Sequence, residues 1–90
     1  MNNIPIENIL GTKSKIKILK LLVNHKVISF SEIKKQIRLN HTTLKKYLRE
    51  LERAGIIKEH EINRFRIYSM SKKNPRAKLI EQLIKYWDNF

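Results

Sequence analysis

The side chains best suited to bind an anion lie in the stretch LNHTTLKKYLRELERAGII, between Leu39 and Ile57. Spacing these residues about 100° apart around a helix axis places four cations within about 60° of Thr42. The leucines at the centre of the stretch fall on the opposite side. We therefore predict a helix that packs an apolar stripe against a core and turns a cationic stripe towards a negatively charged partner. The cationic stripe comprises Thr42, Lys45, Lys46, Arg49 and Arg53.

The sequence offers little support for catalysis or metal binding. It contains no cysteine, which excludes disulfides and thiolate metal ligands. The histidines, His25, His41 and His60, are far apart in the sequence and do not have the spacing of a metal site. No Ser, His and Asp constellation, glycine-rich phosphate loop or pair of suitably spaced carboxylates is present. We expect a protein that is not an enzyme and that uses no cofactor and no metal.

The composition indicates a polyanionic partner. Ninety residues suffice for one small domain, and 20 Lys and Arg against 8 Asp and Glu give a net charge of +12. A surface that serves only solubility usually mixes both signs, so this excess favours nucleic acid as the partner. No apolar run approaches the roughly 20 residues that span a bilayer, and the first residues lack the pattern of a secretory signal. We expect a cytoplasmic protein with no membrane partner.

Local signals predict the helices that would hold the cationic stripe. A first helix is predicted from about Lys13 to Asn24 because apolar residues recur there at helical spacing. The S-x-x-E spacing that begins at Ser29 is a capping box, and it begins a second, short helix. Asn40 can cap the third helix, and Gly55 can adopt the left-handed conformation that ends it. The apolar residues of the first two helices are Ile16, Leu19, Leu22 and Val23, then Ile33 and Ile37.

The remaining elements are a small hairpin and a last helix. The stretches IIKEHEI and FRIYSM are predicted to be two strands joined around Asn63 and Arg64. Val27 and Ile28 are expected to form only a short extended link between the first two helices. Pro75 can occupy the first position of the last helix, where Asn74 caps it. In the second strand, Phe65 and Ile67 alternate with Arg66 and Tyr68.

Two helices joined by a tight turn, the second with a cationic outer face, followed by a hairpin, are typical of a winged helix-turn-helix. The run SFSEIKKQIRLNHTTLKKYLRELERAGII resembles winged helix-turn-helix transcriptional regulators of bacteria and archaea, especially small archaeal regulators of the arsenical-repressor type. The resemblance covers about Leu10 to Met70 and implies double-stranded DNA binding and transcriptional control. We expect a fold that is mainly α with a small β-hairpin: a winged helix-turn-helix DNA-binding domain over 1–74 and a C-terminal dimerisation helix over 75–90.

The resemblance assigns DNA contact to the start of the third helix. Threonine can touch thymine or a phosphate, whereas lysine and arginine can donate to guanine or neutralise the backbone. Contact with bases gives specificity and contact with phosphates gives only affinity, and both roles stay open for Lys46 and Arg49. The family's base-reading positions fall on His41, Thr42, Thr43, Lys45, Lys46 and Arg49, and the cationic stripe adds Arg53.

The hairpin is a second candidate contact with DNA. In related proteins the tip of the wing reaches the minor groove or flanking phosphates, which implies this role for Arg64, with Arg66 in support. Glu59 and Glu61 on the same hairpin would repel phosphate, so a purely structural wing is the alternative. Tyr47 lies between the two stripes of the third helix, and we expect it to pack against the second helix or the hairpin rather than stack on a base.

The last helix carries more apolar surface than a domain of this size can easily cover. An exposed patch of this kind usually marks an interface, and a two-fold partner that presents the same helix is the simplest cover. A monomer whose last helix folds back on its own domain is the alternative. The predicted dimerisation residues are Leu79, Ile80, Leu83, Ile84 and Trp87, and Tyr86 and Phe90 widen the face.

The leading hypothesis is a homodimeric regulator that binds a specific sequence of double-stranded DNA. An architectural, chromatin-like protein with little sequence preference is the main alternative, because residues 31–54, with seven cations and three acids, carry only +4 of the total charge of +12. A winged helix that binds another protein is the third possibility, but it leaves the cationic stripe unexplained.

Overall fold

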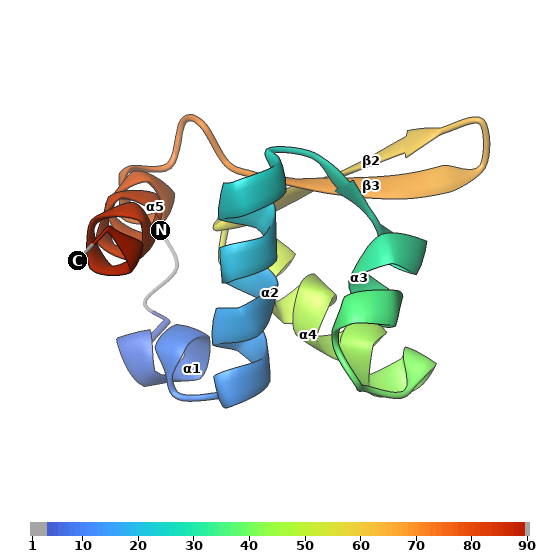
Figure 1. Ribbon diagram of the computed structural model, residues 1–90, viewed down its shortest axis with the longest axis horizontal. Coiled ribbons are helices and arrows are strands. Elements are labelled where there is room, and N and C mark those ends of the chain that lie inside the picture. The colour runs from blue at the N-terminus through green and yellow to red at the C-terminus, as the bar shows by residue number, and fades with distance from the viewer. Residues whose placement is uncertain (1–3, 90) are drawn as a thin grey trace.

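The computed structural model describes residues 4–89, which form a winged helix that is mainly helical, as the sequence predicts. Helices α1 and α5 lie at one end of the molecule, and the β2–β3 hairpin projects from the other (Figure 1). None of the helices in this part of the chain is long and apolar enough to cross a membrane. The elements are α1 (Ile6–Leu10), α2 (Lys13–His25), β1 (Ile28–Ser29), α3 (Phe30–Gln36), α4 (His41–Arg53), β2 (Ile57–Ile62), β3 (Phe65–Met70) and α5 (Pro75–Asp88).

The predicted caps position the helices. The Ser29 hydroxyl accepts a hydrogen bond from the Glu32 backbone N–H at 3.1 Å, which begins α3. The Asn40 side chain accepts from the Thr43 N–H at 2.7 Å and begins α4 only four residues after α3 ends. Gly55 has φ +77°, so the chain turns sharply from α4 into β2. These caps confirm the predicted starts of α3 and α4 and the predicted end of α4.

The sheet has one strand more than the predicted hairpin. Its order is β1-β3-β2, and both pairings are antiparallel. Ile28 of β1 pairs with Tyr68 of β3, so the expected link between α2 and α3 is a short strand. Ile28 and Ser29 carry no strand signal of their own, because their pairing partners, Tyr68 and Ile67, lie far along the chain.

The observed core differs from the apolar pattern of the sequence at two places. Ile18 is fully buried, whereas Ile16, which the sequence analysis places on the apolar stripe of the first helix, is 36% exposed. In β3 the buried side chains are Tyr68 and Met70, and Phe65 is 67% exposed. Phe65 is the first residue of β3 and pairs with Ile62 beside the turn of the hairpin, which projects away from α1 and α5 (Figure 1).

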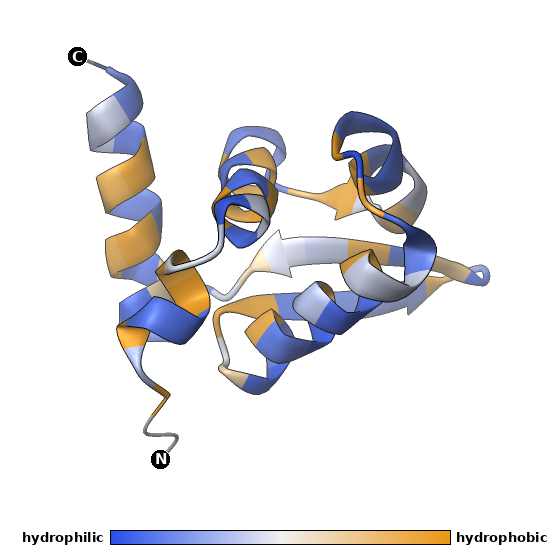
Figure 2. Cartoon of the chain, turned by 90° about the horizontal axis from the view of Figure 1, so that it is seen from below, coloured by the Kyte–Doolittle hydropathy of each residue, from blue (hydrophilic) through white to orange (hydrophobic). Residues whose placement is uncertain are grey.

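Helix α5 packs on α2 through one side only. Ala77 is fully buried, and Ile80 and Ile84 are half-buried against the core. The Asn74 side chain caps α5 by accepting from the Arg76 N–H at 2.8 Å and also donates to the Gly55 carbonyl at 3.0 Å. Figure 2 shows hydrophobic segments along α5 at the edge of the molecule. Phe90, which the sequence places on this apolar face, lies outside the described residues.

Candidate nucleic-acid interface

The outer face of α4 forms the largest part of the candidate interface. The opposite side of the helix is anchored, because Leu44, Leu48 and Leu51 are buried in the core. Anchoring three leucines one helical turn apart fixes which side chains point outward. Six predicted residues line one shallow groove on this face: His41, Thr42, Lys45, Lys46, Arg49 and Arg53.

Two residues at the start of α4 also make contacts within the domain. The His41 ring lies 4.9 Å from the Phe30 ring, centroid to centroid, which joins the start of α4 to the start of α3. Thr43 does not line the groove; it is half-buried and its backbone N–H donates to Asn40. The structure therefore brings together most, but not all, of the residues that the sequence assigns to this helix.

Arg64 and Arg66 are exposed on the hairpin and do not line the groove on α4. Arg64 lies in the tight turn at the tip, where Asn63 has φ +50° and Arg64 has φ +71°. Positive φ at both central residues matches a type I′ turn, in which the second position favours glycine. Arginine at this position is strained, which points to a role for its side chain outside the hairpin.

One acidic residue of the hairpin has a structural partner. The Tyr68 hydroxyl donates a hydrogen bond of 2.6 Å to Glu59, which therefore ties β2 to β3. Burial and the bond to the Glu59 carboxylate raise the pKa of the Tyr68 phenol well above its ordinary value of 10.0. Glu61 is the register partner of Arg66 in the neighbouring strand, so opposite charges lie across the hairpin there.

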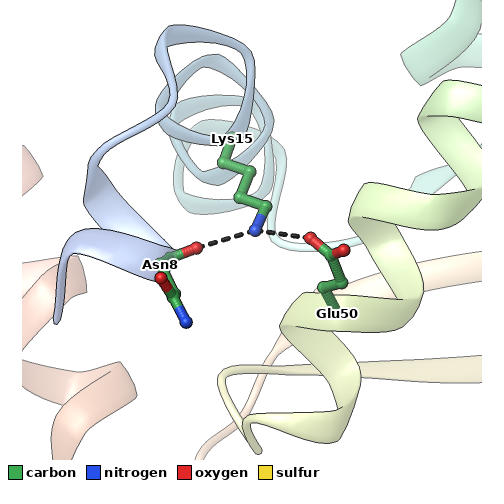
Figure 3. A network of polar contacts seen from close by, with 3 residues as sticks. All are labelled: Asn8, Lys15 and Glu50. Carbon is green, nitrogen blue, oxygen red and sulfur yellow. Dashed lines mark hydrogen bonds and ion pairs between the residues drawn. The ribbon is translucent and has the colours of Figure 1, made fainter. Parts of the chain in front are cut away.

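The sequence analysis misses a buried cation behind the α4 groove. Lys15 of α2 is only 7% exposed, and its Nζ donates to the Asn8 carbonyl of α1 at 2.7 Å. The same Nζ lies 2.6 Å from Oε1 of Glu50 on α4 (Figure 3). It also lies 5.5 Å from the centroid of the ring of Tyr47, which is half-buried against the core. A lysine within a cation-rich helix gives no sequence signal that would distinguish it from its exposed neighbours.

A second surface lies between α2 and α5 and is apolar. The exposed large side chains of α5 include Leu79, Leu83, Tyr86 and Trp87, and Leu83 and Trp87 are 51% and 75% exposed. Ile16 of α2 and Leu10 of α1 line the same groove as Leu83 and Trp87. Within residues 4–89, no three His, Asp or Glu side chains gather as a metal site would require.

The fold and the α4 groove define a class of protein, the winged helix-turn-helix proteins. Residues 12–58 match the sequence profile of the family described as winged helix-turn-helix DNA-binding. Because this match spans more than half of the chain, the protein belongs to that family. The matched residues lie within residues 10–70, the stretch over which the sequence resembles winged helix-turn-helix regulators. A search among curated proteins gives no match.

Several solved structures share the fold over nearly the whole chain. HlyU from Vibrio cholerae aligns with a TM-score of 0.80 and 18% identity, covering 94% of this chain and 89% of HlyU. The transcriptional repressor PagR of Bacillus anthracis aligns with a TM-score of 0.72 and 22% identity, covering 91% and 86%. A regulator of the ArsR family aligns with a TM-score of 0.64 and 18% identity, covering 100% and 99%. At these identities the likeness shows the fold.

Proposed function

We propose that this protein is a homodimeric transcriptional regulator that binds a specific sequence of double-stranded DNA. Helix α4 would enter the major groove, and the β2–β3 wing would contact the flanking backbone or minor groove. The observation that carries this proposal is the α4 groove, because six of the nine residues predicted to touch DNA line it together on a helix whose other face is anchored in the core.

The chemistry of the groove suits both specificity and affinity. Lys46 and Arg49 are exposed donors that can bond to guanine or neutralise phosphates, and Thr42 offers a methyl and a hydroxyl group. Arg64 at the tip of the wing adds a cation at a second point along the duplex. Two separated contact points restrict the orientation of the protein on DNA, which a single helix would not.

The apolar face of α5 supports the dimer. Leu83 and Trp87 are exposed beside Ile16, and a second copy presenting the same face would remove all three from water. A two-fold dimer places two reading helices about one DNA turn apart, roughly 34 Å, and multiplies the affinities of two half-sites. The same pairing explains why α2 exposes Ile16, which lies on the flank of the α5 contact.

Selection of bound sequences from random duplex DNA tests the proposed specificity. We expect an enriched inverted repeat whose two halves are one helical turn apart. Enrichment of a single half-site without symmetry would contradict the dimer. Binding with no enriched sequence would favour the architectural alternative, which the spread of charge along the chain supports. Failure to bind duplex DNA at moderate salt would contradict both.

A further inference from the structure

Glu50 is the acidic residue among those that line the α4 groove. Its side chain is 39% exposed, and its neighbours in the groove include Lys46, Arg49 and Arg53. A carboxylate at this place opposes the binding of a polyanion, because it repels the phosphates that the neighbouring cations attract. A winged helix that binds DNA through this groove must therefore offset the charge of Glu50.

Lys15 supplies the offsetting charge from behind α4. Its ammonium group lies 2.6 Å from Glu50, and the Asn8 carbonyl and the Tyr47 ring hold it in that position. Because the side chain of Lys15 is 7% exposed, solvent and salt screen the pair less than they would at the surface. Figure 3 shows Lys15 reaching from α2 between α1 and α4.

We propose that Lys15 is a positioning residue of the DNA interface, which neutralises Glu50 and fixes α4 relative to α1 and α2 without touching DNA itself. This inference rests on the proposed function of the α4 groove. It predicts that Lys15, a buried residue of α2 that does not contact DNA, affects the affinity for DNA. The alternative is a purely structural network, in which Lys15 and Glu50 contribute to folding and have no electrostatic effect on binding.

The two roles predict opposite effects of Glu50→Gln on the affinity for DNA. Glu50→Gln keeps an oxygen that can accept from Lys15 but removes the negative charge. If Lys15 neutralises Glu50, this variant should bind duplex DNA more tightly, by roughly twofold to fivefold. Lys15→Met keeps the length of the side chain but exposes the charge of Glu50, so binding should weaken by a similar factor. The double variant should bind close to the parent protein. A purely structural network predicts that both single variants weaken binding.

The experiment measures the dissociation constant of each full-length variant for the selected duplex at several salt concentrations, together with its urea unfolding midpoint. Glu52→Gln is the matched control, because Glu52 lies on the same helix but outside the groove and the substitution changes the net charge equally. Lys15→Arg should retain the affinity of the parent because it retains the cation. Should Lys15→Met fail to fold, the comparison of Glu50→Gln with Glu52→Gln still decides between the two roles.

Three results would overturn the inference. The first is weaker or unchanged DNA binding by Glu50→Gln. The second is an equal gain from Glu52→Gln, which would make net charge the cause. The third is an affinity of the double variant as low as that of Lys15→Met. Failure of the parent protein to bind any duplex would instead contradict the proposed function, so the two failures are distinguishable.

Discussion

At the scale of single residues, the hairpin contains a side chain that its own fold does not favour. Arg64 has φ +71° at the turn position where glycine is unstrained. Compared with glycine, a residue with a Cβ in this conformation lowers the stability of the folded state by about 1 kcal/mol. Part of this loss is offset, because glycine would make the unfolded chain more flexible. Retaining arginine at such a cost is expected where the side chain binds a ligand.

Arg64→Gly should therefore have opposite effects on stability and on DNA binding. We expect the free energy of unfolding to rise by about 0.5 kcal/mol while the affinity for the selected duplex falls. Urea unfolding and binding titrations measure the two effects. Arg66→Ala is the control, since Arg66 lies on a regular strand and its loss should weaken binding with no gain in stability. If Arg64→Gly bound DNA as tightly as the parent protein, the tip of the wing would lie outside the interface.

The raised pKa of Tyr68 predicts how the stability of the protein depends on pH under alkaline conditions. An unfolded tyrosine loses its proton near pH 10.0, but the folded protein retains it because the pKa of Tyr68 is raised. The contribution of this residue is therefore complete below about pH 10 and is lost as the pH rises further. The unfolding free energy of the parent should fall more steeply above about pH 10 than that of Tyr68→Phe. Equal slopes for the two proteins would contradict the raised pKa.

At the scale of the element, α4 separates stability from recognition on its two faces. Leu48→Ala opens a cavity in the core and should cost about 2 to 5 kcal/mol of stability. Lys46→Ala and Arg49→Ala should leave the unfolding free energy nearly unchanged, because both side chains are exposed.

The two exposed substitutions also distinguish base contact from phosphate contact. Each should weaken operator binding by about 1 to 3 kcal/mol if the side chain reads a base, and by less if it contacts only phosphate. The measurement compares the affinity of each variant for the selected duplex with that for a scrambled one. Equal losses on both duplexes identify a phosphate contact, and no loss on either would place α4 outside the interface.

At the scale of the whole molecule, the proposed contacts with DNA and with a second copy lie on separate surfaces. The groove on α4 is lined mainly by cationic side chains, whereas the surface between α2 and α5 is apolar. This separation would allow the proposed dimer to form without covering α4.

Changing Leu83 and Trp87 to serine should yield a folded monomer with much weaker operator binding. Both side chains are exposed, whereas Ile84 is half-buried and its substitution would also damage the core. Sedimentation at micromolar concentration measures the assembly state. Val27→Ser is the control, because Val27 is 54% exposed but does not line the α5 groove. A parent protein that sediments as a monomer would contradict the proposed dimer.

The sequence determined the features that depend on neighbours within one or two turns of the chain. The caps at Ser29, Asn40 and Asn74 are local hydrogen bonds, and Gly55 ends α4 through its own backbone freedom. The cationic stripe of α4 also follows from helical spacing alone, which is why its residues could be predicted as a group.

Only the tertiary structure decided the features that join distant parts of the chain. Strand β1 exists because β3 pairs with it, and the burial of Ile18 rather than Ile16 depends on which face of α2 packs against the rest of the domain. The burial of Lys15 requires the Asn8 carbonyl from α1 and the Glu50 carboxylate from α4 at the same point in space. A buried charge is tolerated only where such partners meet, and their meeting depends on how three helices pack, which the spacing of residues within any one helix does not specify.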